Sequence, residues 1–446
     1  MVIVSPIDYR YGRKEVKEIF SEEGRLKYLL KVESEISRTE AKLGLIPKSA
    51  AEIISEKAKT EYVKLDRVKE IESEISHDIM AVVKELSNIS GDAGKYVHLG
   101  ATSNDINDTA TALQIKDFLA FFEEDFLKLE KTLYLLAKTH KDTPMIGRTH
   151  GQHALPITFG LKVSVFLSEI MRHHERLVEA KKRILVGKFM GAVGTGAALG
   201  KKTLEVQENL MQSLGLGIEE GPTQIVNRDR YVEYVSIIAG IATSLEKFAT
   251  EIRNLQRPEI DEVQEPFDEE KQVGSSTMAQ KMNPIISENV CSLARIIRGF
   301  LTPMHESAIL WHERDLTNSA SERFIIPYVS ILIDDIMLKT NYVFANLKVN
   351  KDRMLRNLMM NDLIMGEAYI MFLVSKGYSR QDAHEIVRKS SMEARKNKTR
   401  LIDEVRKVTN LNVPEANPLD YIGNSIEIVD KILEIYESHS NKYHSN

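Results

Sequence analysis

Apolar residues recur at alternating steps of three and four along several stretches of the chain, with charged residues between them. The four clearest stretches are 119–136, 235–252, 290–304 and 329–343; a fifth, 157–186, is less regular but has no internal proline and carries helix-forming residues throughout. This spacing places the apolar side chains on one face of an α-helix, so we predict five long helices. Such helices pack as near-parallel bundles at shallow crossing angles. A helix of about 30 residues is about 45 Å long, which exceeds the needs of one small domain and indicates helices shared between subunits.

The rest of the pattern indicates an all-α protein. No stretch alternates between apolar and polar residues for long enough to predict a sheet. We expect an elongated three-domain fold around a long central helical bundle, completed by oligomerisation. Polar breaks, the first of which contains glycine, separate an N-terminal helical domain, a central long-helix bundle and a small C-terminal helical domain, at 1–102, 103–349 and 350–446. In the last domain, Ser379 followed by Asp382 predicts a helix start, and the residues from Glu437 onward are expected to be frayed.

Composition narrows the class of protein. The 446 residues exceed what one hydrophobic core usually fills, and an apolar content of 43% permits a full core. Sixty basic residues against 65 acidic ones, without a block of like charge, argue against nucleic acid or an anionic membrane as partner. The single cysteine, Cys291, excludes an internal disulfide and is expected to be a small buried residue. Neither a signal peptide nor a membrane-spanning run is present, so we predict a cytoplasmic protein that acts on small molecules.

The segment 274–284 combines a serine-bearing loop with the start of a helix. Asn283 is a good N-cap and Pro284 a good first helical residue. The unpaired N–H groups of that helix start would lie beside Lys281, where carboxylate or oxyanion charge could be held. A serine such as Ser275 can act as a base only where donors and cations stabilise its alkoxide. On these residues alone, a polar turn between two helices is an equally good interpretation.

A second cluster, 147–156, places His150 in a tight polar turn between two long helices. Histidine can deliver a proton near neutral pH, which a leaving amine requires. Its spacing to His153 resembles a metal pair, but the turn is not helical and no third ligand is near in sequence, so we expect no metal. The glycine-rich break 187–200 lacks the spacing and the leading strand of a phosphate loop. A histidine that only bonds backbone remains an alternative for His150.

Two further clusters are more polar than a helix connection requires. One joins Ser76-His77-Asp78 to the run 100–105, which is dense in hydroxyls, amides and carboxylates. The other is 311–323, where arginines and a serine could present cationic and hydroxyl donors to a phosphate or carboxylate. Each cluster alone could equally be an N-cap or a surface ion-pair face.

Taken together, these motifs resemble a known family. Ser275-Ser276-x-Met278-x-x-Lys281-x-Asn283-Pro284 is similar to the signature of the fumarase/aspartase superfamily, whose members cleave a C–N or C–O bond and release fumarate. The companion motifs at 76–78, 147–154, 251–253 and 311–315 resemble the adenylosuccinate lyase family, and the similarity runs from Arg10-Tyr11 to the C-terminal helices. Five separated motifs in the right order are more specific than any one of them.

The resemblance implies a reaction and roles for individual residues. The reaction splits adenylosuccinate into AMP and fumarate, and SAICAR into AICAR and fumarate, in purine synthesis. Ser275 matches the general base, His150 the general acid, and Glu288 an acidic residue paired with a catalytic histidine. Lys281 and Asn283 match groups that hold the succinyl part and its carbanion-like intermediate. His77 is also assigned to the catalytic group. The substrate and phosphate contacts that the resemblance implies are Arg10, Tyr11, Ser76, Asp78, Thr102, Ser103, Gln224, Arg314, Ser319 and Arg323.

The resemblance also implies a homotetramer whose active sites combine three subunits, with no metal or organic cofactor. The chain departs from the family pattern at Ala279, Gln280 and Met282, which flank the catalytic types. Losing the usual proline at Ala279 is expected to loosen the loop, and Ser276 remains a possible substitute for Ser275.

Three alternatives stay open at this stage. Carboxymuconate cycloisomerase resembles 152–160 closely but usually carries tryptophan at the position of His150. Argininosuccinate lyase shares the signature loop but differs around Gly151 and at Trp311. Lens crystallins of the superfamily are non-catalytic, but this chain retains the serine, the histidine and the lysine together.

Overall fold

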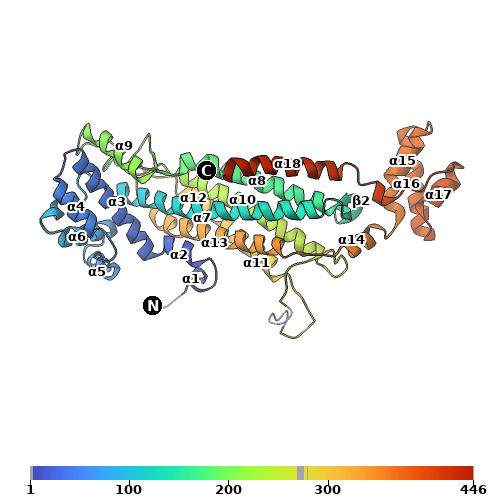
Figure 1. Cartoon of the computed structure of the whole chain (residues 1–446), viewed down its shortest axis with the longest axis horizontal. Helices are drawn as coiled ribbons and strands as arrows, with labels where there is room; N and C mark the ends of the chain where they lie inside the picture. The colour runs from blue at the N-terminus through green and yellow to red at the C-terminus, as the bar shows by residue number, and fades with distance from the viewer. Residues whose placement is uncertain (1–3, 269–275, 279, 445–446) are drawn as a thin grey trace. The chain divides into compact units, whose positions relative to one another are not determined.

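The structure is a computed structural model that describes residues 4–268, 276–278 and 280–444 (Figure 1). It is predominantly helical, which confirms the predicted all-α class. The chain forms two compact units, each drawn from three stretches. Unit 1 comprises Met1–Phe126, His173–Leu245 and Ser292–Leu338, and unit 2 comprises Leu127–Arg172, Glu246–Cys291 and Lys339–Asn446. The division of the chain into three domains remains a prediction.

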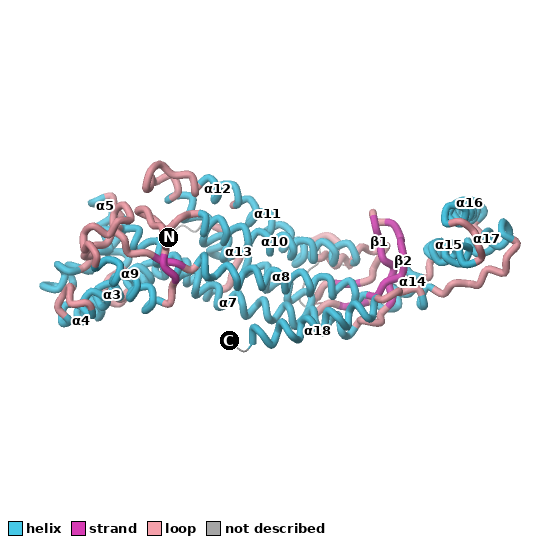
Figure 2. The backbone as a smooth tube through the Cα atoms, turned by 90° about the horizontal axis from the view of Figure 1, so that it is seen from above, coloured by secondary structure: helices cyan, strands magenta, loops and turns pink. Residues whose placement is uncertain are grey.

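The long helices coincide with the predicted apolar stretches. They are α7 (Ser103–Thr139), α8 (Phe159–Ile184), α10 (Asp229–Leu255), α11 (Ile285–Gly299) and α13 (Ser319–Ala345), and most of them run alongside one another in both views (Figures 1 and 2). The predicted helix over 290–304 is divided, because α11 ends at Gly299 and the short helix α12 (Leu301–Glu306) follows. Glycine is a poor residue for a helix interior, which accounts for the break.

Side-chain contacts hold these helices together within each unit. In unit 1 the hydroxyls of Tyr234 on α10 and Ser330 on α13 lie 2.6 Å apart and are both buried. In unit 2 the rings of Phe166 on α8 and Phe248 on α10 stack at 4.4 Å, and Phe344 of α13 meets Phe166 edge-on. The long helices therefore contact one another through buried side chains in both units.

The N-terminal part of unit 1 consists of shorter helices, and one more follows the glycine-rich break. Their bounds are α1 (Pro6–Tyr9), α2 (Lys14–Phe20), α3 (Glu22–Lys42), α4 (Lys48–Lys57), α5 (Leu65–Ile75), α6 (Asp78–Ile89), the 3₁₀ helix η1 (Gly91–Tyr96) and α9 (Lys202–Leu214).

One buried acidic residue of α3 lacks a partner. Glu40 is fully buried, and neither of its carboxylate oxygens has a hydrogen-bond partner in the part of the chain that the structure describes. Burial, together with the nearby Glu33, raises the pKa of Glu40 to about 8. Between the ordinary value of 4.5 and about 8, the folded chain therefore keeps the proton that the unfolded chain has released.

This difference predicts a stability that falls as pH rises through that window, by at most about 1.4 kcal/mol per pH unit for this group. We expect Glu40→Gln to remove the decline. The free energy of unfolding of the variant, measured with urea, should therefore rise relative to that of the wild type between about pH 5 and about pH 8. The exposed Glu52 of α4 provides the matched control as Glu52→Gln. Stability–pH curves that run parallel for Glu40→Gln and the wild type would contradict the expectation.

The C-terminal part of unit 2 has a hydrophobic core of its own, which includes Tyr369, Leu373, Val387 and Leu401. Its elements are α14 (Lys351–Leu358), η2 (Asp362–Met365), α15 (Gly366–Ser375), α16 (Arg380–Asn397), α17 (Leu401–Thr409), η3 (Pro418–Asp420) and α18 (Ser425–His444).

Two predictions about helix ends in this part have different outcomes. Ser379 caps α16 as predicted, since its Oγ accepts from the Asp382 N–H at 3.1 Å. The predicted fraying from Glu437 onward is wrong, because α18 continues to His444. Its residue His439 is buried against Glu130 of α7 at 3.2 Å, so tertiary contacts order the end of this helix.

Short strands complete the fold. β1 (Pro144–Thr149) and β2 (Gln152–Thr158) form an antiparallel hairpin, β3 (Val186–Gly187) pairs with β4 (Gly217–Ile218) in parallel, and β5 (Val263–Gln264) pairs with β6 (Lys348–Val349) in antiparallel. The hairpin was not predicted, because its sequence reads as a polar turn without period-two alternation. Figure 2 shows it as the longest strand pair.

Cys291 is 2% exposed, which confirms the expected buried role. In the described part of the chain, no single helix is long and apolar enough to cross a membrane, and one bent pair, Lys351–Leu358 with Asp362–Ser375, passes by length and composition alone.

Candidate active site

The predicted Ser76-His77-Asp78 motif forms the corner between α5 and α6 in unit 1. Ser76 ends α5 in the left-handed conformation with φ of 56°, and His77 caps α6 by accepting the Met80 N–H at Nδ1 over 3.4 Å. Because Nδ1 accepts this bond, the neutral imidazole carries its proton on Nε2, where it can be donated. Asp78 lies in the first turn of α6, where a negative charge is favourable.

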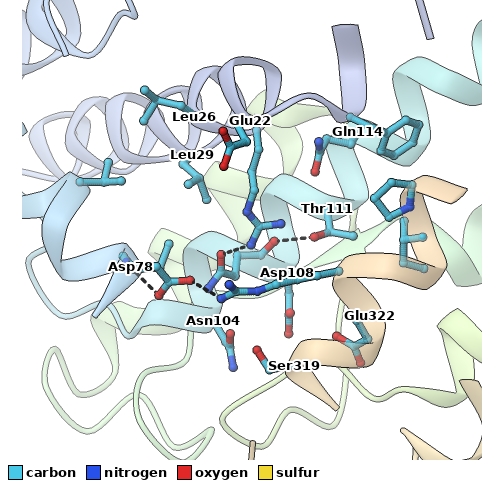
Figure 3. A pocket seen from close by; sticks show the side chains of 18 of the residues that line it. Glu22, Leu26, Leu29, Asp78, Asn104, Asp108, Thr111, Gln114, Ser319 and Glu322 are labelled. Carbon is cyan, nitrogen blue, oxygen red and sulfur yellow. Dashed lines mark hydrogen bonds and ion pairs between the residues drawn. The ribbon is translucent and has the colours of Figure 1, made fainter. Parts of the chain in front are cut away.

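Asp78 also connects this corner to a second predicted cluster. Its Oδ2 accepts from Nη2 of Arg323 on α13 at 2.7 Å. Both residues line a cavity of about 460 Å³ in unit 1 that also includes Arg314 and Ser319, so the fold brings four predicted residues together. Figure 3 shows this pocket, with Asp78, Asn104 and Ser319 around it on α6, α7 and α13.

Arg314 is held over the pocket by amide groups. Its Nη1 donates to the side-chain oxygen of Gln224 at 2.9 Å, so the fold brings these two predicted residues into contact. With its amide oxygen facing Arg314, Asn104 accepts from Nε at 3.2 Å and from Nη1 at 3.0 Å. Neither partner carries a charge, so the positive charge of Arg314 remains available to an anionic ligand.

Sequence reasoning missed a group of ion pairs among residues that line the pocket. Arg228 is buried and binds Asp108 in bidentate geometry at 2.7 and 2.9 Å, while its Nε donates to Glu322 at 2.9 Å. Asn104, Asp108 and Thr111 follow each other at helical spacing on α7, and all three line the pocket. This row of polar residues at helical spacing is the signal that could have marked the face of α7 that lines the pocket.

Arg25 of α3 is a second cation in the pocket that sequence reasoning missed. Its Nη2 donates to the side-chain oxygen of Asn107 at 2.7 Å, a neutral partner. Burial lowers the pKa of its guanidinium, and the positive charge of Arg323 lowers it further. An anion in the pocket would relieve this repulsion between the two arginines.

Thr102 and Ser103 lie at the start of α7 and are held there by a buried carboxylate. Asp105 accepts the Thr102 N–H at 2.8 Å and the Gly191 N–H at 3.0 Å, and it forms an ion pair with Lys188. Asp105 and Lys188 are both fully buried. The glycine-rich break is therefore bound to the first turn of α7 through Gly191 and Lys188.

Arg10 and Tyr11 follow α1 and are exposed or half-buried, and neither lines the cavity. The segment is fixed just after them, since Gly12 donates its N–H to Asp335 at 3.0 Å and Arg13 binds Asp334 at 2.7 Å. Their predicted role in substrate binding remains a prediction.

In unit 2 the predicted turn with His150 is the tip of the β1–β2 hairpin. His150 and Gly151 both have positive φ, 53° and 72°, as a two-residue type I′ turn requires. The side chain of His150 is exposed. Among the described residues, no hydrogen bond or ion pair joins His150 to Lys281 or Glu288.

The hairpin is anchored by Arg148, which precedes the tip. Its guanidinium binds the fully buried Glu262 at 2.7 and 2.8 Å, and Asn357 donates to the same carboxylate at 2.8 Å. Partial burial, with the positive charge of Arg148 nearby, lowers the pKa of His153. His153 therefore lies beside a structural ion pair.

The signature segment leads into α11, but not as predicted. Ser275 and Ala279 lie outside the described residues. The helix begins at Ile285, one residue later than predicted, and Lys281 and Glu288 are exposed while Asn283 is half-buried. The expectation of unpaired N–H groups at this helix start is wrong, because Glu265 accepts the N–H groups of Ile286 at 2.9 Å and Ser287 at 3.0 Å.

Comparisons with known proteins find relatives of this chain over most of its length. A family model described as "Lyase" matches residues 9–299, and one described as "Adenylosuccinate lyase C-terminus" matches residues 362–432. The adenylosuccinate lyase of Pyrococcus abyssi is 50% identical over 97% of this chain and 98% of its own length. That of Methanocaldococcus jannaschii is 46% identical over 97% and 96%.

Solved structures of the same superfamily share the fold. A 3-carboxy-cis,cis-muconate lactonizing enzyme from Pseudomonas putida superposes with a TM-score of 0.89 at 32% identity, over 98% of this chain and 99% of the other. A fumarate lyase from Mesorhizobium sp. BNC1 gives 0.87 at 33% identity, over 97% and 100%.

The helical fold and the matched model thus define a lyase of the fumarase/aspartase superfamily. The relatives that match nearly the whole chain, and the family model that matches its C-terminal residues, identify one family within this superfamily. The chain belongs to the adenylosuccinate lyase family.

Proposed function

We propose that this protein eliminates fumarate from adenylosuccinate to give AMP, and from SAICAR to give AICAR, in purine biosynthesis. The observation that carries the proposal is the pocket of unit 1, where arginines with amide partners and a serine hydroxyl surround a cavity of about 460 Å³. Such groups suit an organic phosphate. Similarity to adenylosuccinate lyases over 97% of the chain supports the same substrates.

The reaction needs a base and an acid on opposite sides of the bond that breaks. Ser275, as an alkoxide, takes the proton from the carbon beside the succinyl carboxylate. The electron pair left on that carbon forms the new double bond of fumarate while the C–N bond breaks. His150 donates its proton to the departing nitrogen, which leaves as the amine.

The intermediate carries doubled charge on the succinyl carboxylate and has to be stabilised by cations and donors. Lys281 and Asn283 supply these groups in the proposal, and Glu288 pairs with a catalytic histidine. Because Glu265 occupies the first N–H groups of α11, the side chains of Lys281 and Asn283 carry this task.

The active site is proposed to form from several chains of a homotetramer. His150 and Lys281 are exposed in the single chain, although elimination requires a site that excludes water. Ile309, Trp311 and Leu316 expose large apolar side chains in the loop that leads to the pocket residues Arg314 and Ser319, as a surface covered by another subunit would. We also propose a cytoplasmic location.

Ultraviolet absorbance of purified protein with adenylosuccinate tests the proposal. Loss of the succinyl-purine absorbance with release of fumarate is the expected result. The structural likeness to the muconate enzyme makes carboxymuconate cyclisation the second candidate. Turnover of carboxymuconate without any change in adenylosuccinate, at any protein concentration, would overturn the proposal.

Arg314 provides a direct test of the phosphate end. A hydrogen bond to a charged group contributes about 1.5–3 kcal/mol, so Arg314→Met should raise KM for adenylosuccinate about 10- to 100-fold. Its kcat should change less, because the phosphate does not take part in bond breaking. Arg314→Lys keeps the charge and is expected to lose less. An unchanged KM in Arg314→Met would remove this residue from the binding site.

A further inference from the structure

Glu265 is a buried carboxylate that binds the start of a distant helix. It is 1% exposed, and its two oxygens accept the Ile286 N–H at 2.9 Å and the Ser287 N–H at 3.0 Å. The Ser287 hydroxyl donates to the same carboxylate at 2.8 Å. Three hydrogen bonds therefore join residues that are about twenty positions apart in the chain, 21 in the case of Ile286.

Gln256, which follows the end of α10, makes a second connection between the same two stretches of chain. Its side-chain oxygen accepts the Glu265 N–H at 2.9 Å, and its Nε2 donates to the backbone oxygen of Met282 at 3.3 Å. One side chain thus contacts the stretch before the signature segment and the stretch that leads into α11. The position of Met282 is fixed in this way between Lys281 and Asn283.

Two of the first N–H groups of α11 are bound by a side chain from outside the helix. Side-chain oxygens at the N-cap usually accept the first N–H groups of a helix. Pro284, the residue before α11, has no such oxygen and leaves that task to Glu265. The negative charge also lies at the helix end where the macrodipole favours it. The Glu265 carboxylate therefore binds the start of α11 directly to the upstream chain.

We propose that Glu265, assisted by Gln256, is a positioning residue that fixes Lys281 and Asn283 at the start of α11 in their reactive geometry. The inference rests on the proposed function, since it assigns these two residues to the succinyl group. Glu265 does not touch the substrate. It acts through the backbone of Ile286 and Ser287 on one side and, through Gln256, on Met282 on the other.

The change Glu265→Gln tests this role with little change in shape. An amide can face only one of the two N–H groups with its oxygen, so the other meets an NH₂ donor. We expect kcat to fall about 100-fold, because small displacements of positioned groups have effects of that size. Affinity for AMP alone is expected to stay unchanged, since the pocket of unit 1 contains neither Glu265 nor its partners. Ser287→Ala removes one bond of three and should lower kcat by a smaller factor.

Glu259→Gln is the matched control, because it makes the same change at an exposed glutamate nearby. Its kcat should equal that of the wild type. A Glu265→Gln variant with wild-type kcat would overturn the proposal. So would a variant whose AMP affinity falls in parallel with kcat, since that result indicates general damage to the fold.

Hydrogen exchange keeps this test separate from that of the proposed function. Exchange of the Ile286 and Ser287 amides should be faster in Glu265→Gln than in Glu259→Gln, and unchanged rates would contradict the inference. A wild-type protein that fails to convert adenylosuccinate would contradict the proposed function. The exchange rates would still show whether Glu265 holds the start of α11.

Discussion

Replacing Ser275 by alanine is expected to lower kcat for adenylosuccinate by about 100- to 10,000-fold, the range that general base catalysis contributes. The variant loses the only group proposed to remove the proton, while the proposed phosphate contacts in unit 1 remain. Because the substrate can still bind, KM should change little. Steady-state kinetics of the purified variant, followed by the loss of succinyl-purine absorbance, measures both quantities.

The neighbouring hydroxyl provides the control for this variant. Ser276→Ala keeps the proposed base and should retain most of the activity. If Ser275→Ala is nearly as active as the wild type while Ser276→Ala is not, the base is Ser276. Near-normal turnover in both variants would show that neither serine removes the proton.

Replacing His150 by glutamine is expected to have a comparable effect, a loss of about 100- to 10,000-fold in kcat, because the departing nitrogen loses its proton donor. Glutamine keeps a polar side chain at the exposed tip of the hairpin, so the fold of β1 and β2 should persist. Circular dichroism checks the fold, and pH profiles of kcat for wild type and variant show whether the limb assigned to the acid disappears.

A second histidine in the same hairpin, His153, provides a control that distinguishes a catalytic role of His150 from a structural role of the hairpin. His153→Gln should retain its activity, because His153 is placed beside Arg148 and not at the tip. Equal losses in His150→Gln and His153→Gln would argue for a structural role of the hairpin alone. Mixing the inactive Ser275→Ala and His150→Gln proteins tests the composite site, since activity should return if different chains supply the two groups.

The sequence predicted the helices well where the apolar stripes are long. Phe122 and Phe126 on α7 and Ile238 on α10 are fully buried, as their spacing required. The hairpin was not predicted because its strands lack an alternation of apolar and polar residues. Arg148 and His153 are polar, and contacts with distant parts of the chain place them in strands. Similarly, His439 lies in a terminal stretch that was predicted to be frayed. Its contact with Glu130, a residue far away in the chain, orders this stretch.

The candidate site was predictable in its residue types but only partly in its geometry. Asp78, Arg314 and Arg323 were expected from polar clusters, and the pocket does bring them together. The pairing of Arg228 with Asp108 could not be inferred, because it joins positions that only the folded chain brings together. The occupied N–H groups of α11 were missed for the same reason, since helix capping was judged from neighbouring residues alone.

The burial of Cys291 has a practical consequence for experiments on the hairpin. It is the single cysteine of the chain, and with 2% exposure it is shielded from thiol reagents in the folded protein. A cysteine introduced by Gln152→Cys, at an exposed position beside the tip, would be the only thiol open to labelling. A fluorophore or spin label could then report on the surroundings of His150 in the native sequence background, without prior removal of a natural thiol.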